Sequence, residues 1–121
     1  MKCREISVLI VEDELIVAMH LEDEMRSFGF SDIDVCTNFD QARMELKDKV
    51  YDLALMDIYL GNRTSYDLAN FAHECGSIVI IISGSVLNCS PHFSHASDFI
   101  RKPWLNSELR NAVKRATEAL A

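Results

Sequence analysis

Three acidic residues, Glu12, Asp13 and Asp57, come directly after two strongly apolar runs of the sequence, at residues 6–11 and 53–56. Runs of this kind are typical of parallel strands that are buried on both faces of a sheet, and the carboxyl ends of such strands lie along one edge. Neighbouring strands lie about 4.8 Å apart, so carboxylates that follow them can converge. Carboxylate oxygens in such a cluster favour a small divalent cation. The three acids therefore predict a metal site at the edge of a sheet.

The rest of the chain alternates between strand-like and helix-like patterns. Apolar and β-branched runs predict strands at residues 6–11, 33–36, 52–57, 78–82 and 98–100. Apolar residues at helical spacing predict helices at about residues 14–28, 66–75 and 105–120, and a further helix that ends near Lys49 and is capped by Asn38 or Asp40. A succession of βα units predicts one α/β domain, residues 1–121, with a parallel sheet between layers of helices.

Some segments carry weaker or different signals. Residues 33–36 alternate between apolar and polar, which favours an edge strand, and residues 98–100 predict a second short edge strand. Residues 61–65, Gly-Asn-Arg-Thr-Ser, predict a loop. Residues 85–96 contain Pro91 and several Ser and Asn residues, so the helix expected there is short or irregular.

Charge and composition exclude several classes of protein. The 121 residues are 49% hydrophobic and carry a net charge of −7, which is ordinary for a folded domain. Residues 1–57 hold 6 basic and 14 acidic groups, whereas residues 58–121 hold 6 and 5. Nucleic acid is bound through clustered Lys and Arg, so a direct nucleic-acid ligand is not expected.

The cysteines and the lengths of the apolar runs indicate the cellular compartment. Four cysteines are scattered without a C-x-x-C pair, which predicts reduced thiols and no zinc site. No apolar run is long enough for a signal peptide or a membrane span. We expect a cytoplasmic protein without a membrane partner.

Two further polar residues belong to the predicted edge, because Ser83 ends the fourth strand and Lys102 follows the fifth. With them, the sequence resembles the receiver domain of bacterial two-component response regulators. The resemblance rests on four strings that occur in order and cover nearly the whole chain. They are V-L-I-V-E-D-E at 8–14, D-L-A-L-M-D-I at 52–58, I-I-I-S-G at 80–84 and F-I-R-K-P at 99–103.

The resemblance implies a flavodoxin-like (CheY-like), doubly wound sheet of five parallel strands in the order 2-1-3-4-5. It also implies that Asp57 accepts a phosphoryl group from a histidine of a sensor kinase or phosphotransfer protein, and that the reaction depends on Mg²⁺, with Mn²⁺ as an alternative. The metal ligands would be Asp13, Asp57 and the backbone carbonyl of Tyr59, with Glu12 binding directly or through water. Such a domain phosphorylates and dephosphorylates itself but acts on no separate substrate, so it is not an enzyme.

The remaining implied roles concern the phosphoryl group. Lys102 would pair with Asp57 before transfer and with a phosphoryl oxygen afterwards, and Ser83 would donate its hydroxyl. Gly84 would leave room beside the pocket. Phe99 lies three residues before the lysine, where the family has an aromatic switch residue, and we expect its burial to change on phosphorylation.

Other functions compete with this interpretation. The acids could have no role other than to stabilise the amino terminus of a helix. Ser83 and Lys102 are each commonplace residues at the end of a strand. The chain could be an interaction module on the same fold that binds its partner regardless of phosphate. A phosphatase or a flavin enzyme is disfavoured, because the first loop lacks a glycine-rich phosphate cradle and Asp57-Ile58-Tyr59 lacks the second aspartate of an Asp-x-Asp motif. We expect a stand-alone signalling module, with homodimer formation, the kinase and the downstream protein left open.

Overall fold

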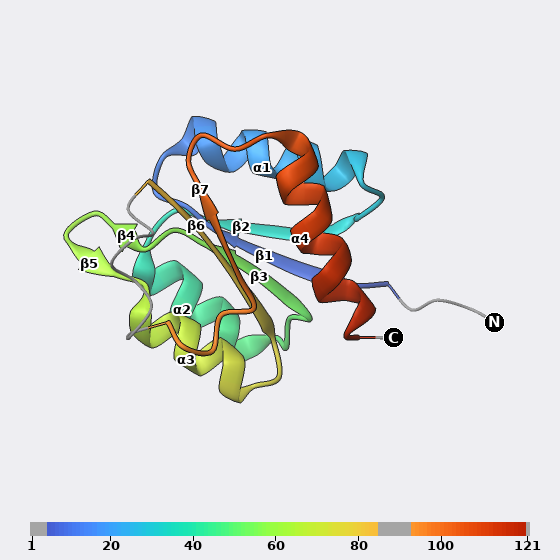
Figure 1. Ribbon diagram of the computed structural model, residues 1–121. Coiled ribbons are helices and arrows are strands. Elements are labelled where there is room, and N and C mark those ends of the chain that lie inside the picture. Colours follow the sequence, from blue (N-terminus) through green and yellow to red (C-terminus); the bar gives the residue numbers. More distant parts are fainter. Residues whose placement is uncertain (1–4, 85–92, 121) are drawn as a thin grey trace.

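A five-stranded parallel sheet forms the centre of the computed structural model, which describes residues 5–84 and 93–120 (Figure 1). The strands lie in the order β2-β1-β3-β6-β7. Their bounds are β1 Ser7–Val11, β2 Asp32–Cys36, β3 Leu53–Met56, β6 Ile78–Ser83 and β7 Asp98–Arg101. The helices are α1 Leu15–Ser27, α2 Phe39–Asp48, α3 Tyr66–Glu74 and α4 Asn106–Glu118. This is the predicted doubly wound, CheY-like fold, with β2 and β7 at the edges as expected.

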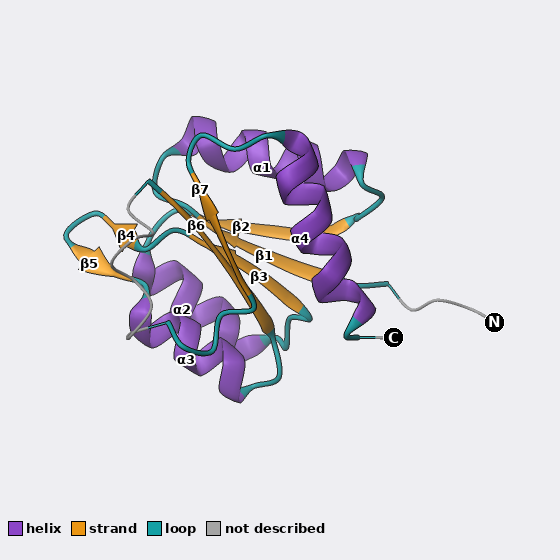
Figure 2. Cartoon of the chain, viewed as in Figure 1, coloured by secondary structure: helices purple, strands orange, loops and turns teal. Residues whose placement is uncertain are grey.

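Helices cover both faces of the sheet, with α1 and α4 on one side and α2 and α3 on the other (Figure 2). Side chains of a strand point alternately to the two faces. In β1, Leu9 and Val11 therefore join the core beneath α2 and α3, while Val8 and Ile10 join the core beneath α1 and α4. Because both faces are covered, the central strands are apolar apart from the terminal Ser7 of β1 and Ser83 of β6, and this is the pattern that indicated them in the sequence.

The boundary between β2 and α2 settles one of the alternatives left by the sequence. Asn38, rather than Asp40, caps α2, because its side chain accepts a hydrogen bond from the Gln41 backbone N–H at 2.8 Å. Capping of this kind stabilises a helix by about 1 kcal/mol. The irregular helix expected within residues 85–96 lies mostly outside the described residues. Residues 93–96, at its end, are not helical.

The prediction of a loop at residues 61–65 was wrong only for Arg63–Thr64, which form a short strand, while Gly61, Asn62 and Ser65 lie outside helices and strands as expected. Strand β4, Tyr59–Leu60, pairs antiparallel with β5, Arg63–Thr64, and the two-residue turn Gly61-Asn62 joins them. Gly61 has a φ of +65°, a conformation that glycine adopts without strain, and Gly-Asn is a recognised turn sequence of short hairpins. Because each strand has only two residues, no alternating pattern marked them in the sequence.

No helix in the described part of the chain is long and apolar enough to cross a membrane.

A polar network joins the edge strand β2 to α2. The fully buried Tyr51 donates its hydroxyl to Asp34 Oδ2 at 2.6 Å and lies 3.1 Å from Glu45 Oε2. Lys49 Nζ lies 2.9 Å from Asp32 Oδ1 and 3.3 Å from Asp34 Oδ2. The hydrogen bond from Tyr51 is the main cause that lowers the pKa of Asp34, and Lys49 contributes to it.

Replacing Tyr51 with Phe should lower the free energy of unfolding by about 1.5 kcal/mol at pH 7, because a part-buried hydrogen bond to a charged group is lost. Since the folded-state pKa of Asp34 is lowered, its contribution is present above the ordinary pKa of aspartate and is lost as the pH falls through the folded value. The loss caused by the substitution should therefore shrink in acid. Urea unfolding at pH 7 and at an acidic pH below the folded-state pKa of Asp34 tests this. Tyr59→Phe, at an exposed tyrosine, is the control. Equal losses for the two variants would contradict the role of the network.

Candidate functional site

The predicted polar residues meet at the carboxyl edge of the sheet. Hydrogen bonds of the backbone continue the ladder past the strand ends and fix the residues there: Glu12 N donates to Cys36 O, Asp57 N to Val11 O and Lys102 N to Ser83 O, each at 3.0 Å. Because β1 lies between β2 and β3, and β6 between β3 and β7, the topology brings these strand ends together.

Lys102 forms the centre of the site. Its Nζ lies 2.8 Å from Glu12 Oε2 and 2.8 Å from Asp57 Oδ2, so one ammonium group bridges two carboxylates. Glu12 is 1% exposed and Asp57 is 7% exposed. The pairing of Lys102 with Asp57 is as expected, but the sequence did not predict its contact with Glu12.

Burial and charge shift the protonation equilibria of this cluster. Burial is the main cause that raises the pKa of the Glu12 carboxyl to about 7, and the charge of Asp57 adds to it, although the bond with Lys102 opposes the rise. Burial by itself would lower the pKa of Lys102, but its bonds with Asp57 and Glu12 outweigh that effect and the pKa is raised. The ammonium group therefore stays charged between the two acids.

The acidic residues have the arrangement that a hard cation needs. Glu12, Asp13 and Asp57 each offer a carboxylate oxygen, and the three atoms lie within 4.8 Å of one another. Glu12 and Asp57 are buried, whereas Asp13 is exposed. Oxygen ligands of this number and type, open to solvent on one side, fit a small divalent cation that keeps several waters. The cluster is therefore able to bind a metal ion.

The hairpin of β4 and β5 closes one side of the site. Gly61 N donates to Asp13 Oδ2 at 2.9 Å, and the Ser65 hydroxyl donates to the backbone carbonyl of Asp57. Tyr59, whose carbonyl was predicted as a metal ligand, begins β4, and its N–H lies 3.4 Å from Asp57 Oδ1. Sequence reasoning missed the part played by Ser65, which is fully buried.

Two hydrogen bonds join the loop that carries Lys102 to helix α1. Trp104 Nε1 donates to Glu24 Oε1 at 2.6 Å, and the Asn106 side-chain amide donates to the other oxygen of Glu24. Trp104 also packs against the core beneath α1 and α4. The Glu24 contact adds a second anchor, which holds the chain two residues beyond Lys102.

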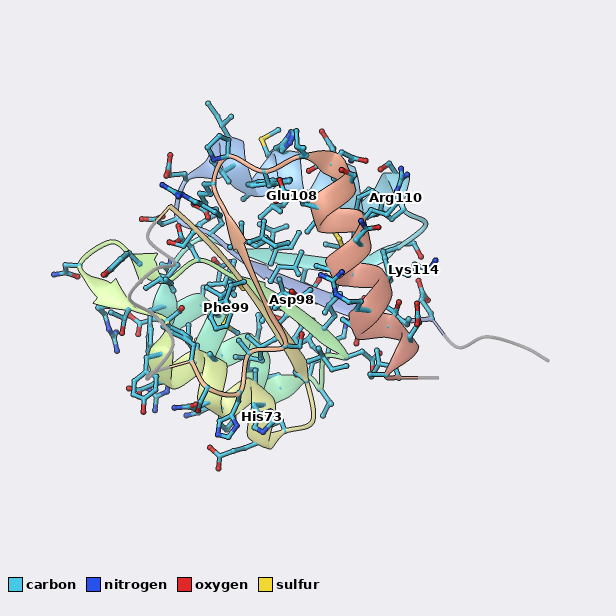
Figure 3. The ribbon with its side chains drawn as sticks, in the orientation of Figure 1. His73, Asp98, Phe99, Glu108, Arg110 and Lys114 are labelled. Atoms are coloured by element: carbon cyan, nitrogen blue, oxygen red, sulfur yellow. The ribbon has the colours of Figure 1, made fainter. Side chains whose placement is uncertain are left out.

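The other predicted residues take different places. Ser83 is 2% exposed at the end of β6. Gly84 follows it at the surface, where an added Cβ would meet no atom of the described residues within 4 Å. Phe99 lies on the edge strand β7 opposite Ile81 and is 39% exposed, outside the acidic cluster (Figure 3).

Comparisons with known proteins agree with this geometry. The family model of the response regulator receiver domain matches residues 8–114, so the chain belongs to that family. No curated protein matches the chain significantly in a sequence search.

Solved receiver domains share the fold. A CheY-like receiver domain protein from Methanospirillum hungatei is 21% identical, with a TM-score of 0.84 over 95% of this chain and 96% of that chain. The response regulator TrrA of Thermotoga maritima, solved with Mg²⁺ and BeF, is 22% identical, with a TM-score of 0.82 over 92% and 98%. The receiver domain of the Pseudomonas aeruginosa sensor kinase PA1611, with a magnesium ion in its active-site cleft, is 24% identical, with a TM-score of 0.79 over 93% and 97%.

Proposed function

We propose that this receiver domain accepts a phosphoryl group on Asp57 from a histidine of a sensor kinase or phosphotransfer protein. The observation that carries the proposal is the bridge from Lys102 to Asp57 and Glu12 beside the exposed carboxylate of Asp13. A carboxylate is a modest nucleophile toward an anionic phosphoryl group, so the protein must position it and neutralise charge. The site offers a cation, a metal-binding cluster and a fixed acceptor.

In the proposed transfer, an Asp57 carboxylate oxygen forms the new bond to phosphorus, and the bond from phosphorus to the donor imidazole nitrogen breaks. The imidazole leaves and takes up a proton. Lys102 exchanges its contact with Asp57 for one with a phosphoryl oxygen, and Ser83 donates its hydroxyl to the same group. Phe99 then changes its burial, which alters the surface offered to the downstream protein.

Mg²⁺, with Mn²⁺ as an alternative, is the proposed cofactor, and Mg²⁺ is the ion named in the two neighbouring structures described above. Glu12, Asp13, Asp57 and the Tyr59 carbonyl would hold it. When bound, the ion supplies positive charge that offsets the charge on the phosphoryl oxygens. The domain would hydrolyse its own phosphoryl group but act on no separate substrate, and we propose a cytoplasmic location.

An interaction module independent of phosphate is the competing function. In the structure, Lys102 is shared by the buried carboxylates of Glu12 and Asp57, and burying these charges costs desolvation energy. A module that binds its partner regardless of phosphate would not need this arrangement. The site therefore favours the phosphorylated switch.

The proposed function is tested by intact-mass spectrometry of the protein after incubation with acetyl phosphate. With Mg²⁺, the mass should increase by one phosphoryl group, and with excess EDTA it should not. An established receiver domain serves as the positive control. No mass increase under conditions that label this control would contradict the proposal.

A protein donor also needs a surface on which to dock, and an exposed apolar patch lies beside the site. It consists of Leu15, Ile16 and Met19 on α1, which are 60%, 83% and 54% exposed. Next to it, a cleft of about 410 Å³ is lined by Ile16, Val17, His20, Lys102, Pro103 and Trp104. Because Lys102 lines this cleft, a protein that covers the patch reaches the mouth of the site. Exposed apolar patches commonly mark such contacts.

Replacing Ile16 with Asp should slow phosphoryl transfer from a phosphorylated histidine phosphotransfer protein by about tenfold, because a charge would be placed in the apolar contact. Transfer from acetyl phosphate should be unchanged, because a small donor does not need the patch. Val50→Asp is the matched control, because Val50 is also an exposed apolar residue (67%) and precedes β3, away from the carboxyl ends of the strands. Equal slowing with both donors would show that the substitution damages the site itself.

A further inference from the structure

A second surface feature, remote from the apolar patch, lies between α2 and α3. It is a groove of about 420 Å³, lined by Phe39, Arg43, Lys47, Arg63, Asp67, Leu68 and Phe71. The two helices run side by side on one face of the sheet, and the β4–β5 hairpin lies at one end of them (Figure 1). We refer to this feature as the α2–α3 groove.

Helical spacing explains how the groove is built. Phe39, Arg43 and Lys47 recur every four residues, so they form one stripe along α2. Leu68 and Phe71 on α3 face this stripe. The floor of the groove is apolar: Phe39 and Leu68 belong to the core and are 8% and 2% exposed, and the partly buried Phe71 packs against that core.

The rim of the groove is cationic although the whole chain carries a net charge of −7. Arg43 and Lys47 are exposed, and neither forms a salt bridge within residues 5–84 and 93–120. Arg63 stacks on the Phe39 ring at 3.5 Å from its centroid and contacts Asp40 at 3.3 Å through a largely exposed pair. Exposed pairs of this kind are weak, so a ligand carboxylate can replace Asp40.

We propose that the α2–α3 groove docks an acidic, amphipathic segment of a partner protein. An apolar side chain of the segment would contact Phe39, Leu68 and Phe71, and its carboxylates would pair with the cations on the rim. An apolar centre with a charged rim is the usual anatomy of a protein interface, and complementary charge gives it specificity. Arg63 belongs to the hairpin whose Gly61 donates to Asp13, so the groove shares an element with the site.

Nucleic acid fits the groove less well, although it is also anionic. A phosphate backbone extends over many charges and needs a continuous basic surface. Here Asp40 and Asp67 interrupt the cations of the rim. A short segment that combines carboxylates with apolar side chains matches both parts of the groove.

The test is fluorescence anisotropy with a short labelled peptide in which Glu residues alternate with Leu and Phe, in EDTA so that neither metal nor phosphorylation of Asp57 is involved. The peptide should bind saturably, and its binding should shift the amide NMR signals of α2 and α3. Two control peptides, one with Lys in place of Glu and one with Ser in place of Leu and Phe, should bind at least about tenfold more weakly.

Charge-reversed variants locate the binding surface. Arg43→Glu combined with Lys47→Glu should weaken binding by about tenfold, since two favourable charge contacts become repulsive. Arg110→Glu combined with Lys114→Glu makes the same change on α4, at labelled positions away from the groove (Figure 3), and should leave binding unchanged. Equal weakening by both double variants, equal binding of the basic peptide, or tighter binding of a single-stranded oligonucleotide would each overturn the proposal. Because EDTA is present, failure here is distinguishable from failure of the phosphoacceptor function.

Discussion

Replacing Asp57 with Asn is expected to abolish uptake of a phosphoryl group from acetyl phosphate while leaving the fold intact. An amide oxygen is not a nucleophile toward phosphorus at neutral pH, and the substitution also removes one charge from the cluster of three carboxylates. Lys102 keeps its partner Glu12, and the repulsion between Asp57 and Glu12 disappears. The free energy of unfolding should therefore change by no more than about 1 kcal/mol.

The measurement is intact mass after incubation with acetyl phosphate and Mg²⁺, accompanied by urea unfolding of both proteins. Asp48→Asn provides the control, because Asp48 is an exposed aspartate at the end of α2 and its loss should not affect labelling. Labelling of the Asp57→Asn protein to the same extent as the native protein would mean that another residue is the acceptor.

Replacing Lys102 with Met has the second large expected effect. Two buried carboxylates would lose the cation that they share, and removing one member of a buried ion pair leaves uncompensated charge. In EDTA, the free energy of unfolding should fall by about 2–3 kcal/mol. This is at the lower limit of the loss usual for a broken buried ion pair, because the site is open to solvent on one side. Mg²⁺ should stabilise this variant more than the native protein, because the ion would supply the missing positive charge.

Urea unfolding in EDTA and in Mg²⁺ measures both parts of this expectation. Lys114→Met, which removes an exposed lysine of α4, should be neutral under both conditions. If Lys102→Met unfolds at the same urea concentration as the native protein in EDTA, the two acids do not depend on Lys102 for compensation, and its assigned role is wrong.

The ends of the central strands could be predicted because burial on both faces leaves a clear mark in the sequence. Residues 53–56 and 78–82 are uniformly apolar, so a polar residue that follows them stands out. Parallel pairing then places Glu12, Asp57, Ser83 and Lys102 along one edge without further information. For this reason the fold, and the placement of these residues at one edge of the sheet, could be predicted together.

Other features depend on tertiary structure and left weaker signals. The contact between Lys102 and Glu12 joins residues 90 positions apart, and its geometry depends on how deeply each side chain is buried. The hairpin that contains Gly61 has strands too short to show a period. The α2–α3 groove combines side chains from two helices and the hairpin, so no continuous segment of sequence predicts it.

The central claim is that Asp57 becomes an acyl phosphate in a reaction that needs a divalent cation. The most direct measurement is borohydride reduction of the protein after incubation with acetyl phosphate and Mg²⁺, followed by peptide mass spectrometry. Borohydride reduces an aspartyl phosphate to homoserine, which marks the modified residue. We predict homoserine at position 57, and none there when EDTA replaces Mg²⁺. Homoserine at another aspartate, or none in a protein whose intact mass shows a phosphoryl group, would contradict the account.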